Sequence, residues 1–217
     1  MTQSSQEPPR FVVYDLDGVI TRKDTFTALV VGQLMRSPLR LLRALPVLVN
    51  MLRGKKPEAS RRIAEIALAG MTDTDYTALA TQLGRKIAAD TKWMRFSAVQ
   101  RIRHQHESGA PIIIATATER RLAEALLAAA GVPYDLLSAS LLNTTTSGLT
   151  VSDHRVGQRK KEALIELAVP IASAVFVTDS MTDLPTAEAA SRVVLIGASE
   201  RTRRRFSASK VKLAQGS

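Results

Sequence analysis

Four short stretches of this sequence carry side chains that could do chemistry. Asp15 and Asp17 are separated by one residue and directly follow the apolar run Phe11–Tyr14. A second acidic pair, Asp179 and Asp183, follows another apolar run. Carboxylates held close together raise each other's pKa, and a cation between them removes that cost. Because Mg²⁺ prefers oxygen ligands in octahedral geometry, the two pairs predict a magnesium site.

A lysine and a threonine add the means to hold a phosphate group. Lys160 lies near the start of an expected helix, and its ammonium is a compact charge suited to phosphate. The adjacent Lys161 is a rival for this role. Thr116 would offer a hydroxyl and neighbouring backbone N–H groups at a strand-to-helix turn, which suits an anion. The four stretches together supply a metal site, a nucleophile, an acid/base and a phosphate cradle.

The elements around these residues predict an α/β fold. The segments expected to form strands are 11–14, 112–115, 135–142, 174–177 and 193–196, with a hairpin tip at 143–148. The helices expected between them are 119–130, 160–168 and 186–190. We expect Thr118 to cap the first of these helices and Gly131 to close it.

Strands that alternate with helices predict a doubly wound, mainly parallel sheet. In such sheets, ligands bind beyond the carboxyl ends of the strands, and the aspartates and Thr116 would converge there.

The segment from Asp24 to His106 has a helical pattern, rich in Ala and Leu and without strand-like alternation. The expected organisation is a catalytic α/β core formed by residues 1–22 and 107–217, with an inserted all-helical cap formed by residues 23–106. Trp93 and Phe96 are expected in the apolar core of that cap. Residues 1–10 are polar and are expected to be disordered, without a secretory signal.

The apolar stretch from Phe26 to Lys56 has two interpretations. Arg36, Arg40 and Arg43 interrupt it, so it lacks the roughly 20 uncharged residues that a membrane-spanning helix needs. At helical spacing these arginines share one face, opposite the leucine-rich side. Two prolines argue against one continuous helix. The favoured interpretation is an amphipathic helix or helix pair packed into the cap, and the alternative is a helix that lies on an anionic membrane.

The composition narrows the class of partner. Cysteine is absent, which excludes disulfides, thiolate metal sites and cysteine nucleophiles. The net charge of +10 favours anionic partners such as a phosphorylated small molecule or an anionic membrane surface. The arginines near the C-terminus are expected to form a solvated tail. Phe206 is the one aromatic residue among them, and single-stranded nucleic acid is usually bound by several stacking aromatic side chains, which argues against nucleic acid as a partner. The expected location is the cytoplasm, with the inner membrane surface as an alternative.

The motifs resemble those of the haloacid dehalogenase-like (HAD) hydrolases. They are Asp15-Leu16-Asp17-Gly18-Val19, Ile112-Ile113-Ile114-Ala115-Thr116, Gly157-Gln158-Arg159-Lys160 and Asp179-Ser180-Met181-Thr182-Asp183-Leu184-Pro185. Their order along the chain is that of the family. The helical insertion between the first two motifs is similar to the cap of the phosphoserine-phosphatase-like branch (subfamily IB).

The resemblance implies Mg²⁺-dependent hydrolysis of a phosphate monoester through a phospho-aspartate on Asp15. Asp17 would act as general acid/base, with its backbone carbonyl on the metal. Thr116 would bind the phosphoryl oxygens, and Lys160 would offset the charge of the phospho-aspartate. The implied metal site comprises Asp15, Asp17, Asp179 and Asp183.

Two positions depart from the family pattern. Val19 stands where the family often has Thr, so we expect the Thr21 hydroxyl to steady Asp17 instead. Thr178 precedes Asp179 where Gly is common. The Asp at position 17 favours a phosphatase over a dehalogenase, because a phosphate ester's leaving group needs a proton donor.

Three functions remain open at the level of sequence. The favoured one is hydrolysis of a small phosphometabolite. The second is hydrolysis of a lipid phosphate such as phosphatidylglycerophosphate, on which some relatives in this branch act. The third is a non-catalytic anion- or lipid-binding protein, against which the intact set of motif residues speaks.

Overall fold

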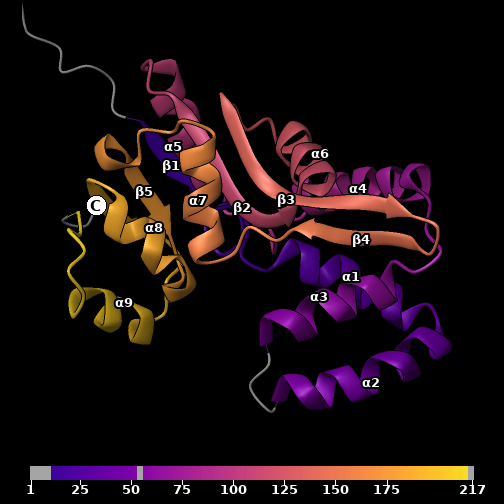
Figure 1. Ribbon diagram of the computed structural model, residues 1–217. Coiled ribbons are helices and arrows are strands. Elements are labelled where there is room, and N and C mark those ends of the chain that lie inside the picture. The colour runs from indigo at the N-terminus through magenta and orange to yellow at the C-terminus, as the bar shows by residue number, and fades with distance from the viewer. Residues whose placement is uncertain (1–10, 53–55, 215–217) are drawn as a thin grey trace, which may run out of the picture.

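The computed structural model describes residues 11–52 and 56–214, and one six-stranded sheet runs through it (Figure 1). The strands are β1 (Val12–Tyr14), β2 (Ile112–Glu119), β3 (Leu136–Thr145), β4 (Gly148–Asp153), β5 (Val175–Thr178) and β6 (Arg192–Leu195). They lie in the order β4-β3-β2-β1-β5-β6. All neighbours are parallel except β3 and β4, which form an antiparallel hairpin. The predicted tail, residues 1–10, lies outside the described residues.

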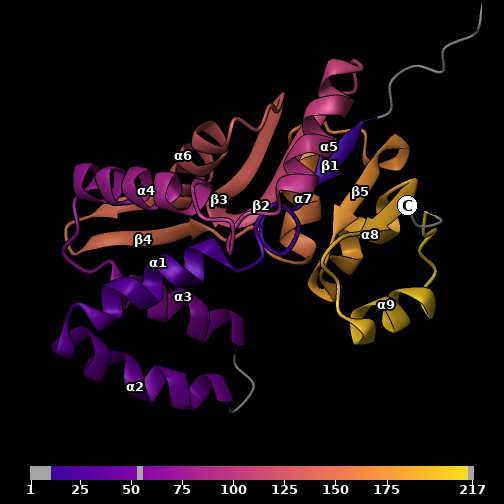
Figure 2. The ribbon, with the colours of Figure 1, turned by 180° about the vertical axis from the view of Figure 1, so that it is seen from behind.

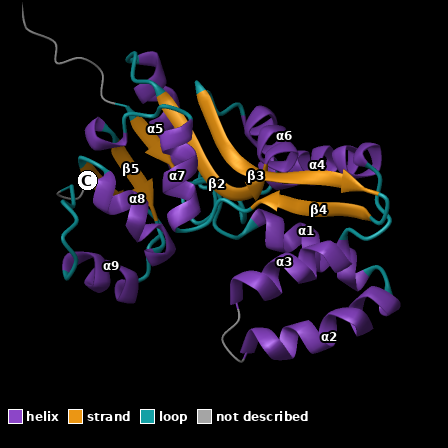
Figure 3. Cartoon of the chain, in the orientation of Figure 1, coloured by secondary structure: helices purple, strands orange, loops and turns teal. Residues whose placement is uncertain are grey.

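Helices cover the sheet and extend beyond it (Figure 3). The helices before β2 are α1 (Thr25–Met35), α2 (Pro38–Leu52), α3 (Lys56–Ala67), α4 (Asp73–Ala88) and α5 (Phe96–Glu107). Those after it are α6 (Arg120–Ala130), α7 (Gln158–Glu166), α8 (Leu184–Ala189) and α9 (Glu200–Ser207), with short 3₁₀ turns at Ile171–Ser173 and Met181–Asp183. The predicted α/β class, with a mainly parallel sheet and an N-terminal helical region, is confirmed.

Successive strand residues bury side chains on opposite faces of the sheet. In β1, Val12 and Tyr14 join a cluster with residues of α5 and α6, whereas Val13 joins a cluster with residues of α7, α8 and α9. Figure 1 shows α7 and α8 in front of the sheet, and the reverse view in Figure 2 shows α5 on the other face. Strands that are buried on both faces are apolar at every position. Their continuous apolar segments could therefore be recognised in the sequence.

Strand β2 is longer than its apolar run indicated, and this moves the cap of α6. The strand continues to Glu119, whose carboxylate accepts hydrogen bonds from the backbone N–H groups of Arg121 (2.9 Å) and Leu122 (3.3 Å). The prediction that Thr118 caps this helix is therefore wrong, because the carboxylate one residue later satisfies two free N–H groups at once. Gly131 ends the helix in the left-handed conformation (φ +59°), as expected.

Helices α1, α2 and α3 bury an apolar cluster of their own. It includes Leu34, Ala44 and Ile63, and Val151 of the β3–β4 hairpin closes it. Helix α5 instead packs on the sheet through residues such as Ile102. The division into a core of residues 1–22 and 107–217 and a cap of residues 23–106 stays a prediction, and this packing favours assigning α5 to the core.

Helix α2 differs in part from its sequence interpretation. It continues through Pro46 and packs into the cluster of α1 and α3 through Ala44, whereas Leu42 is 62% exposed. The Arg40 guanidinium turns inward and donates to the carbonyls of Ala67 (3.0 Å) and Ala69 (2.8 Å) at the end of α3. Arg36 lies at the end of α1 rather than in α2. The packing of α2 in the helical region agrees with the favoured interpretation. The prediction that the three arginines share one face is wrong, because Arg40 serves carbonyls that lack helical partners and Arg36 ends another helix.

Two aromatic predictions also need correction. Phe96 is 46% exposed, and Trp93 packs against the cluster beneath the sheet, so neither belongs to the apolar core of α1–α3. The expected C-terminal tail is in fact helix α9, whose arginines face solvent while Phe206 is fully buried against the sheet. Within the described residues, no helix is long and apolar enough to cross a membrane.

Candidate active site

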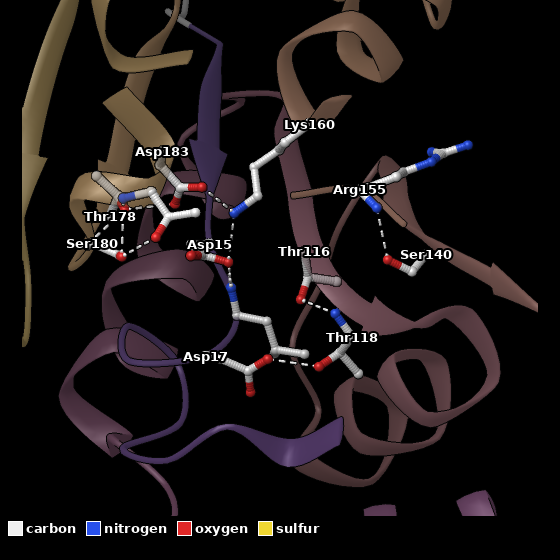
Figure 4. Close-up of polar contacts among 12 residues, drawn as sticks. Asp15, Asp17, Thr116, Thr118, Ser140, Arg155, Lys160, Thr178, Ser180 and Asp183 are labelled. Carbon is white, nitrogen blue, oxygen red and sulfur yellow. Dashed lines mark hydrogen bonds and ion pairs between the residues drawn. The ribbon is translucent and has the colours of Figure 1, made fainter. Parts of the chain in front are cut away.

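The polar residues predicted from the motifs meet at the carboxyl ends of the parallel strands (Figure 4). Asp15 follows β1, Asp179 follows β5, and Lys160 lies in the first turn of α7. A pocket of about 360 Å³ opens there, and the predicted residues among its lining are Asp15, Asp17, Lys160, Asp179 and Asp183. Thr116 lies beside it in β2, fully buried. A second, larger depression on the outer face of α4 contains none of these residues.

Lys160 is shared by two buried carboxylates. Its ammonium lies 3.2 Å from Asp15 Oδ1 and 2.7 Å from Asp183 Oδ1, and its side chain is 3% exposed. Burial by itself lowers the pKa of an ammonium, but the two carboxylates outweigh it and raise the pKa of Lys160 above its usual value. Lys161 does not enter the pocket lining. Of the two adjacent lysines, Lys160 is the one that lines the pocket, and its phosphate-binding role stays a prediction.

Asp15 is buried at the centre of this arrangement. Burial raises the pKa of its carboxyl well above the usual value, the charge of Lys160 opposes the shift, and Asp183 adds to it. Its Oδ1 also accepts a hydrogen bond from the Leu16 N–H (2.8 Å). Asp183 is held on its other side by the Thr178 hydroxyl, which donates to Oδ2 (2.8 Å). Each oxygen of Asp183 therefore already has a partner.

The carboxylate of Asp17 turns away from Asp15 toward the start of α1. The Thr118 hydroxyl donates to Oδ2 (2.6 Å), and the Thr25 N–H donates to Oδ1 (2.9 Å). The Thr21 hydroxyl reaches Oδ1 at 3.2 Å, as expected from the missing hydroxyl at Val19. Burial, followed by the charge of Asp24, raises the pKa of Asp17 to about 6, and these hydrogen bonds limit the rise.

Thr25 and Thr118 belong to the site although none of the four motifs contains them. Their hydroxyls lie 2.8 Å apart, so a residue at the start of α1 meets a residue at the end of β2. A threonine just before a helix usually caps it, and the sequence pattern predicts that role for Thr118. Its position two residues after Thr116, on a strand that runs farther than its apolar part, was the available signal.

Asp179 packs against the backbone of the loop that carries Asp17. Gly18 adopts φ +81°, and a Cβ atom there would lie 2.1 Å from Asp179 Oδ2. Any other residue at position 18 would push this carboxylate away. Burial and then the nearby Asp183 raise the pKa of Asp179. The anionic forms of Asp15 and Asp179 are thus both destabilised by burial, and a nearby cation would stabilise them.

Residues 12–188 match the family model described as haloacid dehalogenase-like hydrolase. This protein belongs to that family. A search among curated proteins finds no match.

The solved structures similar in fold to this protein include phosphoserine phosphatases. A protein of unknown function from Bordetella pertussis Tohama I aligns with a TM-score of 0.74 at 18% identity, covering 96% of this chain and 99% of that one. A probable phosphoserine phosphatase from Vibrio cholerae aligns with a TM-score of 0.64 at 18% identity, covering 96% of this chain and 61% of that one. A substrate-bound phosphoserine phosphatase aligns with a TM-score of 0.61 at 9% identity, covering 97% of this chain and 95% of that one. At these identities the likeness concerns the fold.

The donors in this hydrolase's pocket fit Mg²⁺. Among the described residues, no three acidic or histidine side chains are grouped so that they could hold a metal by themselves. Asp15, Asp17 and Asp179 all line the pocket, and the set that the family resemblance implies, two carboxylates and the Asp17 backbone carbonyl, consists of oxygen donors. Mg²⁺ takes one or two carboxylates and keeps several waters, so this set suits it. Asp183, whose oxygens are engaged by Lys160 and Thr178, would support the site from the second layer.

An arginine that the motifs do not contain fixes the loop of the hydrolase between Asp17 and Ile20. The Arg95 guanidinium donates to the carbonyls of Val19 (Nε, 3.1 Å) and Gly18 (Nη2, 3.2 Å). Its backbone N–H also donates to the Ile20 carbonyl (2.9 Å). Arg95 lies far from the loop in sequence, at the start of α5, so no local pattern could have identified it.

Proposed function

We propose that this hydrolase is a Mg²⁺-dependent phosphatase that transfers the phosphoryl group of a phosphate monoester first to Asp15 and then to water. The observation that carries this proposal is the buried cluster of Asp15, Lys160 and Asp183, with Asp17 held separately at the same pocket. A non-catalytic binding protein would have no need to keep a buried carboxyl, its counter-cation and a second acid of raised pKa together. Functional sites are where such perturbed groups gather.

The two aspartates have different environments and therefore different tasks. Asp15 must be ionised to attack phosphorus, and Lys160 favours that form. A bound Mg²⁺ would supply further positive charge to the phosphoryl oxygens and to Asp15. Asp17, whose pKa is raised to about 6, carries a proton in a larger fraction of molecules near neutral pH than an ordinary carboxyl does. It would donate that proton to the leaving oxygen as the ester P–O bond breaks, and later accept one from the attacking water.

Thr116 would hold the phosphoryl group in place. Its hydroxyl oxygen accepts the Thr118 N–H (3.0 Å), so the hydroxyl's own proton remains for a phosphoryl oxygen. Because Thr116 is fully buried, this donor is shielded from bulk water and acts in a medium of low dielectric. The pocket volume of about 360 Å³ suits a small phosphometabolite.

Steady-state hydrolysis of aryl and alkyl phosphates, with Mg²⁺ and after chelation, tests this function. We expect Asp15→Asn to lower turnover by several orders of magnitude, because a carboxamide has no anionic oxygen to attack phosphorus. Glu188→Gln, an exposed acid on α8 outside the pocket, is the matched control and should retain activity. Turnover that survives in Asp15→Asn would contradict the covalent route, and indifference to chelation would contradict the metal.

A lipid phosphate is the second candidate substrate, and the surface of α1 and α2 favours it. Nine large apolar side chains are exposed in the described chain, and six of them lie on these two helices: Val31, Met35, Leu39, Leu42, Leu45 and Val49. Arg36 and Arg43 are exposed beside them. Large apolar patches on soluble proteins mark interaction sites, and an apolar face with arginines at its border suits an anionic membrane.

A further inference from the structure

Two cations at the mouth of the catalytic pocket have no part in the proposed phosphoryl transfer. Arg22 and Lys23 line the same pocket as Asp15 and Lys160, and both side chains are exposed. No described residue places a carboxylate within ion-pair distance of either side chain. Asp24, the acid that follows them, accepts the Thr27 N–H (2.7 Å) and caps α1.

The backbone that carries these cations is fixed against the segment that begins α5. The Arg22 N–H donates to the Trp93 carbonyl (2.7 Å), and Thr21 forms an isolated antiparallel bridge with Met94. The Lys23 ammonium lies 5.0 Å from the centre of the Trp93 ring. An aromatic face attracts an ammonium without neutralising its charge. This contact therefore helps to hold Lys23 at the pocket.

A third cation crowds this side of the pocket. Burial and the neighbouring charge of Arg22 lower the pKa of the Arg95 guanidinium, and Asp179 only partly opposes them. Arg95 itself is committed to the Gly18 and Val19 carbonyls, which carry no net charge. Carboxylates also line this pocket, Asp24 among them, but none forms a described ion pair with Arg22 or Lys23. Both exposed cations can therefore make charge-assisted hydrogen bonds to an anion at the mouth.

We propose that Arg22 and Lys23 form a subsite for a second anionic group of the substrate. The substrate would then be a phosphate monoester that also bears a further phosphate or a carboxylate, with the reacting phosphate at Asp15 and the second anion at the mouth. This inference rests on the proposed phosphatase function, because that function places the reacting phosphate at Asp15. The chemistry is the same for a soluble metabolite and for the phosphodiester of a phospholipid.

Competition against hydrolysis of p-nitrophenyl phosphate tests the subsite. The inhibitors are linear alkanediol bisphosphates of increasing length, each paired with the alkyl monophosphate of the same length. The wild-type protein should bind the bisphosphate of matching length more tightly than its monophosphate. In the double variant Arg22→Gln/Lys23→Gln this preference should fall about tenfold, since two charge-assisted contacts are lost.

Arg201→Gln, an exposed arginine on α9 away from the pocket, is the matched control and should keep the preference. A bisphosphate preference that is absent at every length, or that the double variant retains, would overturn the subsite. If the wild-type protein does not hydrolyse p-nitrophenyl phosphate, the proposed function fails, and calorimetric titration of the same bisphosphates into wild-type and double-variant protein then decides the subsite separately.

A soluble ligand and a ligand in a membrane distinguish the two possible sources of the second anion. The same variants are compared on a soluble bisphosphate and on a phospholipid with a terminal phosphate monoester in vesicles. Dependence on Arg22 and Lys23 with either ligand supports the subsite and names its source. Equal behaviour of wild-type and double-variant protein with both ligands overturns it.

Discussion

The Lys160 ammonium is the counter-charge for two carboxylates that are themselves buried. Removing one partner of a buried ion pair costs about 3–5 kcal/mol, because the charge left behind has neither water nor a partner. We therefore expect Lys160→Met to lower both the free energy of unfolding and the turnover number severely. Lys161→Met, the adjacent control, should change the free energy of unfolding by less than about 0.5 kcal/mol. Chemical denaturation and aryl phosphate hydrolysis measure both quantities.

Equal losses in the two lysine variants would show that Lys160 is not the site's counter-cation. A low pH should partly rescue the stability of Lys160→Met, because protonation of Asp15 or Asp183 relieves the repulsion that the substitution exposes.

The hydrogen bond from Thr118 to Asp17 should set the pH range of turnover. Asp17 must carry a proton to serve the leaving group, and its pKa is raised to about 6, so hydrolysis of alkyl phosphates should decline as pH rises above that value. The Thr118 hydroxyl stabilises the carboxylate form and so lowers this pKa. Thr118→Val should therefore move the decline to higher pH.

Profiles of kcat against pH check this shift. Thr77→Val, on the exposed face of α4, is the control and should leave the profile in place. A profile of Thr118→Val that coincides with the wild type would mean that Asp17 is not the group whose ionisation limits turnover.

At the scale of elements, the connection between β4 and α7 determines where Lys160 lies. Asp153, at the end of β4, pairs with Arg159 of α7 (2.8 Å) and with Arg155 (3.0 Å). Arg155 in turn donates to Ser138 of β3 (3.0 Å). These contacts tie the first turn of α7 to the sheet, one residue before Lys160.

Asp153→Asn should therefore destabilise the protein by about 1–2 kcal/mol at neutral pH. The hydrogen bond from Arg159 is the largest cause that lowers the pKa of Asp153 below its usual 3.8. A carboxyl whose pKa is lower when folded stabilises above the unfolded value and loses that contribution as pH falls through the folded value. The difference between wild type and variant should thus shrink below about pH 4.

Free energies of unfolding across that pH range measure the effect. Glu166→Gln is the control, because Glu166 also pairs with Arg159 but is 58% exposed, and exposed pairs contribute little. A difference between wild type and Asp153→Asn that persists unchanged at acid pH would contradict the ion-pair explanation.

At the scale of the whole molecule, the apolar face of α1 and α2 separates the two substrate classes. If this face meets an anionic membrane, the wild-type protein should co-sediment with anionic vesicles, and more so at low salt. The triple variant Leu39→Gln/Leu42→Gln/Val49→Gln should lose that binding while hydrolysing soluble aryl phosphates normally, because the three side chains lie outside the pocket.

Ile165→Gln is the matched control, since Ile165 is 58% exposed but lies on α7. It should bind vesicles like the wild type. Wild-type protein that remains in the supernatant with anionic vesicles at low salt would remove the lipid candidate and leave a soluble phosphometabolite as the substrate.

Much of the α/β core was predictable because its signals are local. A parallel strand covered on both faces is apolar at each position, so the runs before Asp15 and Asp179 are visible in the sequence. Chain topology then brings the ends of such strands to one edge, which predicted that Asp15, Thr116 and Asp179 converge. The family model over residues 12–188 agrees with this fold.

The contacts that only the tertiary structure decided join residues far apart in the chain. Sequence could not rank Lys160 above Lys161, because the choice depends on which side chain α7 turns toward Asp15 and Asp183. The role of Arg95 could not be predicted for the same reason, since the carbonyls that it contacts lie on another loop.

In the helical region, too, the sequence predicted a local pattern but not the tertiary contacts. The amphipathic pattern of α2 indicated that one face would be apolar, and that was correct. It did not indicate whether that face would be buried, and the structure leaves Leu42 exposed while Arg40 turns inward to the end of α3. Periodicity reports only that a helix has two faces, whereas the carbonyls and apolar surfaces that other elements present decide which face is covered.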